Sequence, residues 1–186
     1  MPRDFRDVAE VYDFLKALGA SEKLIRHVIL VGEAAELLIE KLNHLNVSFD
    51  EKFVRLGVAF HDAGKILHPE ELSIPGKKHE LDGQALLIAE GVDQQLAHSC
   101  VSHGQWQLMD CTLEEILVAL ADTLWKGKRD EKLETRVIEE ISKQLGFERW
   151  ELFLELDSSF ESIASGGAER LKRSRVDEEP LRQSSG

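Results

Sequence analysis

VAFHDAGKIL, residues 58–67, joins an apolar run to two adjacent ionisable side chains, His61 and Asp62. The run before them consists of valine, alanine and phenylalanine, which are residues typical of a protein core. Burying an ionisable group without a partner is costly, so these two side chains require hydrogen bonds, solvent or a bound ion. The stretch therefore predicts a helix that ends at a polar site beside an apolar core.

The composition indicates one globular domain. The chain has 186 residues, 42% of them hydrophobic, and no apolar run approaches the ~20 residues that a membrane-spanning helix needs. The first ten residues are too acidic for a signal peptide, and Cys100 and Cys111 are too few for a disulfide framework. The formal net charge of -12 disfavours a broad nucleic-acid surface, which needs a basic face. We expect a cytoplasmic protein that acts on a small molecule, with no membrane partner.

Apolar residues recur at helical spacing almost throughout the chain, as do Val8, Val11 and Leu15. Ser21 is predicted to cap the second helix, and SFDE (48–51) and TLEE (112–115) are predicted to be capping boxes. No alternating strand pattern exceeds a few residues. The sequence predicts an all-α bundle with helices over 5–18, 22–42, 48–61, 79–90, 93–103, 112 onward, 130–145 and 148–164.

The apolar pattern stops near residue 165. The chain is therefore predicted to form one helical domain over residues 1–165, followed by a polar, disordered tail over 166–186. The sequence SGG (165–167) stands at this boundary. The tail holds a small basic cluster, but acidic residues follow it closely, so a solvated segment is favoured over a nucleic-acid-binding arm.

Ionisable side chains lie on the apolar faces of three predicted helices. His27 shares a face with buried-type residues, His61 follows Val58 at helical spacing, and Asp122 lies within LVALADTLW. A single buried histidine usually donates to a backbone carbonyl, and a single buried aspartate usually caps a helix or forms an ion pair. A shared divalent cation would satisfy all three helices at once, because imidazoles supply nitrogen lone pairs and carboxylates supply charge. We therefore expect a metal site.

The order His27, His61-Asp62, Asp122 resembles that of the HD-domain metal-dependent phosphohydrolases over roughly residues 20–130. Two-metal branches of that family have two further histidines, and KKHELDG and CVSHGQW supply His79 and His103 in those places. The resemblance implies a helical bundle that holds two divalent ions, which imidazole ligands suggest are Fe, Mn, Co or Ni rather than Mg. It implies one ion on His27, His61, Asp62 and Asp122, and a second on His79 and His103, with Asp62 bridging the two.

The two middle histidines also have simpler interpretations. His79 could be a solvated residue at a helix start, and His103 could interact with a helix C-terminus. Departures from the family patterns matter as well. Gly104-Gln105-Trp106 follows His103, which disfavours the HD-GYP cyclic-dinucleotide phosphodiesterases. The chain looks closer to the symmetrical diadenosine-tetraphosphate hydrolases, although that branch has HT where this sequence has HG.

Phosphoester or phosphoanhydride hydrolysis needs charge stabilisation near the ions, and Asp62 and Lys65 are the predicted catalytic residues. Lys65 lies one turn beyond His61 if the helix continues, and it still reaches back if the helix ends at Gly64. Such a lysine is typical of HDxGK members of the family. The predicted substrate-binding cations, for a nucleotide or another small phosphorylated molecule, are Lys65, Lys77, Lys78, Lys126 and Arg129. Apart from Lys65, ordinary surface solubility is the favoured explanation for each of them.

Two other functions remain open at the level of sequence. Some two-metal HD proteins are di-iron oxygenases with the same kinds of ligand. A non-catalytic module that binds a metal or a nucleotide as a sensor is the third possibility, although the complete ligand set argues against it.

Overall fold

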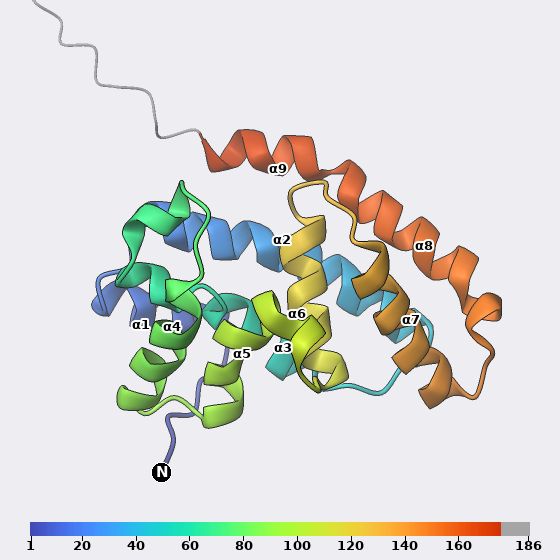
Figure 1. The fold of residues 1–186 in the computed structure, drawn as a ribbon, viewed down its shortest axis with the longest axis horizontal. Coiled ribbons are helices and arrows are strands. Elements are labelled where there is room, and N and C mark those ends of the chain that lie inside the picture. The colour runs from blue at the N-terminus through green and yellow to red at the C-terminus, as the bar shows by residue number, and fades with distance from the viewer. Residues whose placement is uncertain (176–186) are drawn as a thin grey trace, which may run out of the picture.

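The computed structural model describes residues 1–175, and within that range the protein is all-α, as predicted (Figure 1). Between Arg3 and Val92 there is an isolated β-bridge. No helix of the described range is long and apolar enough to cross a bilayer. The α-helices are α1 Val8–Ala17, α2 Glu22–His44, α3 Glu51–Phe60, α4 Lys78–Ala89, α5 Gln94–Gln105, α6 Leu113–Leu124, α7 Glu131–Leu145, α8 Arg149–Ser165 and α9 Gly167–Ser174. The 3-10 helices are η1 Ala63–Ile66, η2 Pro69–Leu72 and η3 Trp106–Leu108.

The core is organised around three helices that contact one another: α2, α3 and α6. Helix α6 is apolar on most of its surface, with Ile116 through Ala121 all buried, which is the pattern of a helix surrounded by others. Helices α7 and α8 pack on one side of this centre, and α1, α4 and α5 cover the other (Figure 1). The helices α2 and α6 and the turn after α3 therefore meet in the interior, where they place His27, Asp122 and His61-Asp62.

The predicted helix starts are partly confirmed. The Ser21 side chain accepts a hydrogen bond from Leu24 N, and Thr112 and Glu115 form the predicted capping box of α6. The capping box predicted at Ser48 is wrong, because Asp50 caps α3 by accepting from Phe53 N at 2.9 Å. The three-residue spacing from Asp50 to Phe53 is the spacing that an N-cap carboxylate requires.

The turn after α3 depends on two glycines. Helix α3 ends at Phe60, before either predicted end, and η1 carries Lys65 on a tight turn. The Lys65 ammonium nevertheless reaches back, to 2.7 Å from Asp62 Oδ2. A Cβ atom on Gly64 would lie 1.9 Å from the carbonyl oxygen of His79, and one on Gly83 would lie 2.7 Å from Gly64 N. Only glycine allows this backbone approach. It brings the first turn of α4 against the His61-Asp62 turn.

The C-terminal segment corrects the predicted domain boundary. Residues 167–174 form α9, so the tail predicted from residue 166 begins too early, while the part over 176–186 lies outside the described residues. Gly167 packs on Gly127, where a Cβ atom would lie 2.1 Å from the Gly127 nitrogen. The SGG stretch therefore packs closely against the backbone at Gly127. The composition misled the prediction because small and charged residues, rather than large apolar ones, make this contact.

Arg170 fixes α9 to the ends of two other helices. It is only 5% exposed, and its guanidinium donates to the carbonyl oxygens of Trp125 at 2.7 Å, Leu124 at 3.3 Å and Ile163. These carbonyls lie at the ends of α6 and α8, where the usual intrahelical partners run out, and Arg170 adds to the bonds that Leu124 O and Ile163 O accept from Gly127 N and Gly166 N. A cation at two helix C-termini is also favoured by the helix dipoles.

We expect Gly167→Ser to destabilise the protein by about 2 kcal/mol, because the new side chain would force two backbones apart. Ala168→Ser introduces the same side chain at the exposed neighbouring position and is the matched control. Urea denaturation followed by circular dichroism measures both. Equal stability of the two variants would mean that the glycine contact does not hold α9 in place.

Candidate metal centre

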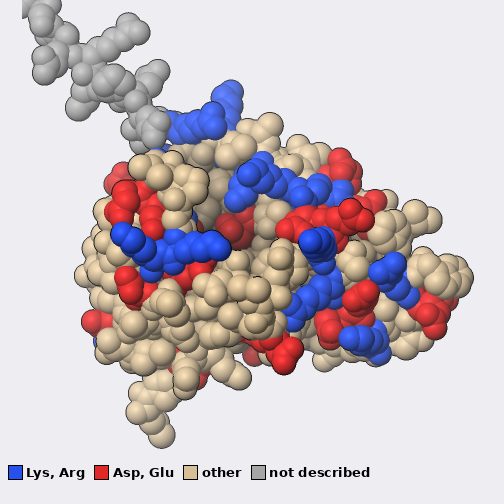
Figure 2. All heavy atoms as spheres, viewed as in Figure 1, with Lys and Arg blue, Asp and Glu red and all other residues tan. Residues whose placement is uncertain are grey.

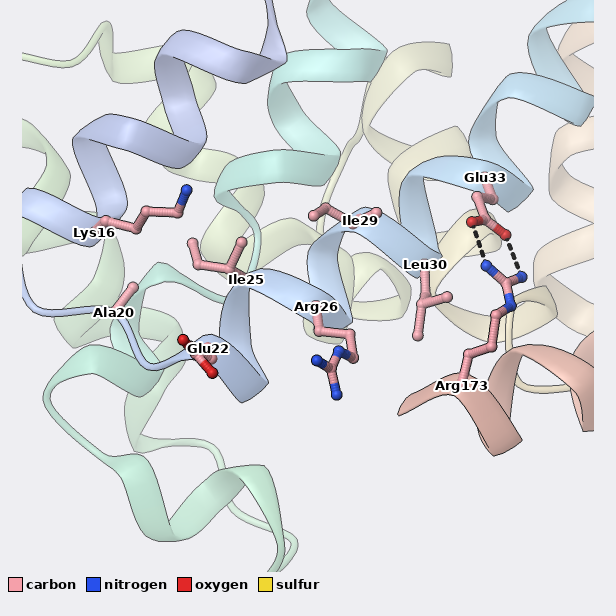
Figure 3. A pocket seen from close by; sticks show the side chains of 9 residues that line it. All are labelled: Lys16, Ala20, Glu22, Ile25, Arg26, Ile29, Leu30, Glu33 and Arg173. Atoms are coloured by element: carbon pink, nitrogen blue, oxygen red, sulfur yellow. Dashed lines mark hydrogen bonds and ion pairs between the residues drawn. The ribbon is translucent and has the colours of Figure 1, made fainter. Parts of the chain in front are cut away.

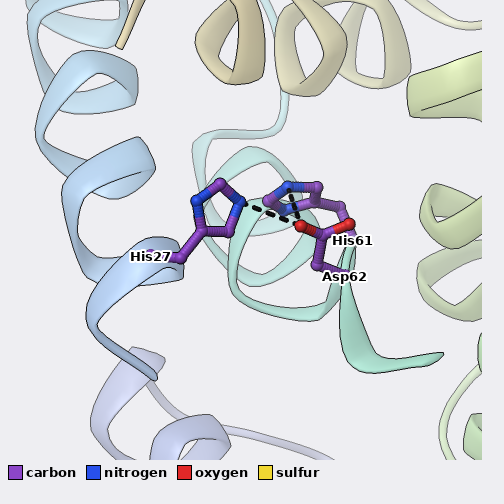
Figure 4. Close-up of side chains that lie close together, drawn as sticks. All are labelled: His27, His61 and Asp62. Carbon is purple, nitrogen blue, oxygen red and sulfur yellow. Dashed lines mark ion pairs between the residues drawn. The ribbon is translucent and has the colours of Figure 1, made fainter. Parts of the chain in front are cut away.

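Six histidine and aspartate side chains from five places in the chain meet in one cluster. Helix α2 supplies His27, the turn after α3 supplies His61 and Asp62, and Figure 4 shows these three side chains pointing toward one another. Helices α4, α5 and α6 add His79, His103 and Asp122. The atoms available as metal ligands form three overlapping groups, each within 4.8 Å: His27, His61 and Asp62; His61, His103 and Asp122; Asp62, His79 and His103.

Asp62 lies at the centre of the cluster, and its two oxygens face different histidines. Oδ2 is 2.9 Å from His27 Nε2 and 3.5 Å from His61 Nε2. Oδ1 is 3.3 Å from His79 Nε2 and 3.6 Å from His103 Nε2. We call His27 and His61 the first histidine pair, and His79 and His103 the second histidine pair.

Asp122 adds a second carboxylate to one side only. Its Oδ1 is 3.3 Å from His61 Nε2 and 3.7 Å from His27 Nε2. The first histidine pair therefore shares two carboxylate oxygens, whereas the second pair shares one. The two sides are not separate, because His103 also has a ligand atom within 4.8 Å of those of His61 and Asp122.

Hydrogen bonds on the far side of the rings orient the histidines. His61 Nδ1 is 2.6 Å from Val58 O, and His103 Nδ1 is 3.0 Å from Ser99 O. A carbonyl oxygen only accepts, so in both rings Nδ1 carries the proton and the lone pair of Nε2 points into the cluster. Such outer contacts are typical of histidines that bind metals.

Glu71, in η2, performs the same task for His79, and the sequence reasoning missed it. Its Oε2 is 2.5 Å from His79 Nδ1 and accepts from His79 N at 3.1 Å, while Oε1 accepts from Lys78 N at 3.2 Å. One carboxylate thus caps the start of α4 and fixes the ring of His79. No short sequence motif connects Glu71 to His79. In the sequence, Glu71 is only one acidic residue in a loop that contains two prolines.

The cluster passes a test of fit for divalent cations. The Nε2 atoms of His27, His61 and His79 and the Oδ1 atom of Asp62 are buried and make no hydrogen bond within the described residues, although they lie near one another. Two atoms bound to one first-row ion at ~2.1 Å lie about 3.0 to 3.4 Å apart, and most of the observed separations are close to this range. Converging lone pairs that lack donors are the arrangement that a cation satisfies.

The carboxylates and imidazoles of the cluster shift one another's pKa values. Burial and the neighbouring His61 lower the pKa of His103 to about 4, so its ring is neutral at pH 7. Burial disfavours the ionised form of Asp62, but His61, His27 and His79 outweigh it and hold the pKa of Asp62 well below its usual range. Against the effect of burial, carboxylates raise the pKa of His61 and His79. Metal binding needs neutral imidazoles, so a bound ion would displace protons from these two rings.

A cavity of about 360 Å³ opens onto the cluster at His27. Lys65 and Lys126, both predicted substrate contacts, line it, and Lys65 Nζ is 2.7 Å from Asp62 Oδ2. Figure 2 shows a hollow below the end of α9 with Lys and Arg side chains along its rim. The other three predicted contacts are not among its lining residues. Lys77 and Lys78 are exposed at the start of α4, and Arg129 binds Glu134, Asp157 and Glu161.

A larger cavity, of about 900 Å³, lies beside α2 and contains none of the six cluster residues. Ile25, Leu30 and an ion pair between Glu33 and Arg173 are among its lining residues (Figure 3). Its titratable side chains do not converge on a common point in that view. Of these two cavities, only the smaller one adjoins the histidine and aspartate cluster.

The chain is similar to known proteins over much of its length. The tRNA (cytidine(56)-2'-O)-methyltransferase of Thermoplasma volcanium is 28% identical over 147 residues, an alignment that covers 71% of this chain and 40% of that protein. No solved structure matches significantly. The HD domain family matches residues 24–125, which contain all six residues of the cluster. The chain therefore belongs to the HD domain family.

Proposed function

We propose that this protein is a metal-dependent phosphohydrolase that cleaves a phosphoester or phosphoanhydride bond of a nucleotide or another small phosphorylated molecule. One observation carries the proposal: the two oxygens of Asp62 face two histidine pairs, and one of these histidines, His27, lines a cavity together with lysines. Membership of the HD domain family supports it. Lysine side chains beside a cluster of potential metal ligands favour the binding of an anionic substrate.

In this proposal the cluster holds two ions. The first histidine pair, Asp122 and Asp62 would bind one, and the second histidine pair and Asp62 would bind the other. Fe, Mn, Co or Ni fits this mixture of nitrogen and oxygen ligands better than Mg. When bound, such ions activate a water molecule and polarise a phosphoryl oxygen.

The side chains of the protein itself bind and orient the phosphate. The Lys65 ammonium contacts Asp62 and lines the cavity, so it can bind a phosphoryl oxygen beside the cluster. His61, Asp62, His79 and His103 are each no more than 7% exposed at the side chain, whereas His27 and Asp122 are 16% and 22% exposed. Substrate therefore approaches past His27 and Asp122, and the remaining ligands stay shielded from bulk water.

Two other activities receive less support. A di-iron oxygenase would use similar ligands, but a cavity with several cationic side chains suits a phosphate better than an uncharged substrate. Methyl transfer to tRNA is the activity in the name of the Thermoplasma relative, of which this chain spans only 40%. The net charge of -12 disfavours a broad RNA-binding surface.

Asp62→Ala should remove most of both ions, because this carboxylate is the ligand that the two histidine pairs share. Metal content per chain, measured by mass spectrometry after dialysis, checks this. Asp82→Ala removes an aspartate that pairs with His68 on the surface of α4 and should retain all metal. Full metal content in Asp62→Ala would rule out the proposed centre.

Double variants test the division of ligands. His79→Ala combined with His103→Ala should leave about one ion per chain, because both changes affect the same ion. His27→Ala combined with His79→Ala should leave almost none. His98→Ala, on α5 but bound to Glu115, is the matched control. Equal losses in the two double variants would contradict the two-ion arrangement.

Lys65→Ala should retain its metal and lose roughly 10²-fold in phosphate release, the effect of one electrostatic contact in a shielded site. Lys65→Arg should recover only part of the activity, because a planar guanidinium does not replace a compact ammonium. Lys52→Ala, which removes an ion pair with Asp4, is the control. Phosphate release from a panel of nucleotides gives the readout, and unchanged turnover in Lys65→Ala would remove this lysine from the mechanism.

A further inference from the structure

Helix α9 lies outside the residues that match the HD domain family, yet it forms part of the cavity above the metal-ligand cluster. The match ends at residue 125, and α9 spans Gly167–Ser174. Leu171, Ser174 and Arg175 line the same cavity as His27 and Lys65. The segment after the family match therefore contributes one wall of the proposed substrate site.

Three contacts fix this wall in place. Gly167 packs on Gly127, and Arg170 donates to carbonyl groups at the ends of α6 and α8. Arg173 makes a two-pronged ion pair with Glu33 of α2, at 2.7 Å and 2.6 Å. Glu33 lies six residues after His27 on the same helix. The end of α9 is thus held against the helix that carries a cluster histidine.

The lining of this cavity has an unusual charge for the chain. Acidic residues outnumber lysine and arginine by 35 to 23 in the sequence, but no Asp or Glu is among the cavity's lining residues. Four cationic residues from separate segments line it: Lys23, Lys65, Lys126 and Arg175. Lys65 contacts Asp62 and so lies at the cluster. One phosphoryl group beside the cluster would need no more than Lys65, so Lys23, Lys126 and Arg175 are left to bind a further anionic group.

We propose that Arg175, with Lys23 and Lys126, forms a subsite for a second anionic group, so that the cavity prefers molecules with two linked phosphate groups to those with one. The proposal rests on the proposed function in placing the first phosphate at the cluster. A guanidinium binds two phosphate oxygens at once, and no Asp or Glu is among the residues that line the cavity together with Arg175. Helix α9 acts as the element that carries this specificity.

Binding of inorganic pyrophosphate and inorganic phosphate to the manganese-loaded protein tests the subsite without requiring turnover. Isothermal titration calorimetry gives both affinities, and the manganese content of the recovered protein shows whether pyrophosphate has removed metal. Arg175→Ala should weaken pyrophosphate binding about tenfold and change phosphate binding less than twofold. Arg175→Lys should recover part of the loss because it keeps the charge.

Lys172→Ala, an exposed change on α9 outside the cavity lining, is the matched control and should alter neither affinity. Gly167→Ser should mimic Arg175→Ala for pyrophosphate while it keeps its manganese, because it displaces the wall. Equal losses for phosphate and pyrophosphate in Arg175→Ala, or no loss, would overturn the subsite. A protein that hydrolyses neither nucleotides nor other small phosphoesters and phosphoanhydrides, pyrophosphate included, but still shows the Arg175-dependent preference would refute the proposed function and leave the subsite standing.

Discussion

One buried carboxylate organises this protein. Asp62 is 2% exposed and presents its two oxygens to two pairs of histidine Nε2 atoms, which come from α2, the turn after α3, α4 and α5. Its position requires α3 to end at Phe60 and the chain to turn at once, and the turn requires glycine at residue 64 so that α4 can lie against it. The helical bundle is built to bring these groups together, and its apolar core lies around them.

Without a bound cation, such a cluster destabilises the folded state. Four buried ligand-type atoms make no hydrogen bond within residues 1–175, and buried polar atoms without partners destabilise a protein. The Nδ1 atoms of three of these histidine rings, which face away from the cluster, do have hydrogen-bond partners. The partners are Val58 O, Ser99 O and Glu71. The rings are therefore preorganised, so an ion need not spend binding free energy on ordering them. Metal binding and folding stability are then coupled, because only the folded chain brings these ligands together.

Most helices, and the clustered residues His27, His61-Asp62 and Asp122, could be predicted from local signals in the sequence. His79 and His103 were named only through the family resemblance. Helical periodicity and N-caps are local signals, and His27, His61 and Asp122 each occupied a position where an apolar residue was expected. Other features depend on contacts between distant segments. Glu71 reaches His79 across a loop, Arg129 binds carboxylates of α7 and α8, and Gly167 packs on Gly127. No local pattern distinguishes such residues from ordinary surface acids, cations and glycines, so the sequence placed Arg129 at the substrate and residues 167–174 in a tail.

Anomalous diffraction from crystals of the manganese-loaded protein tests the central claim most directly. If Asp62 bridges two ions, the map contains two peaks, one beside each oxygen of Asp62, separated by roughly 3.5 to 4 Å as in other two-metal sites. The first peak is expected among His27, His61 and Asp122, and the second between His79 and His103. A single peak, or peaks that do not contact Asp62, would contradict the account.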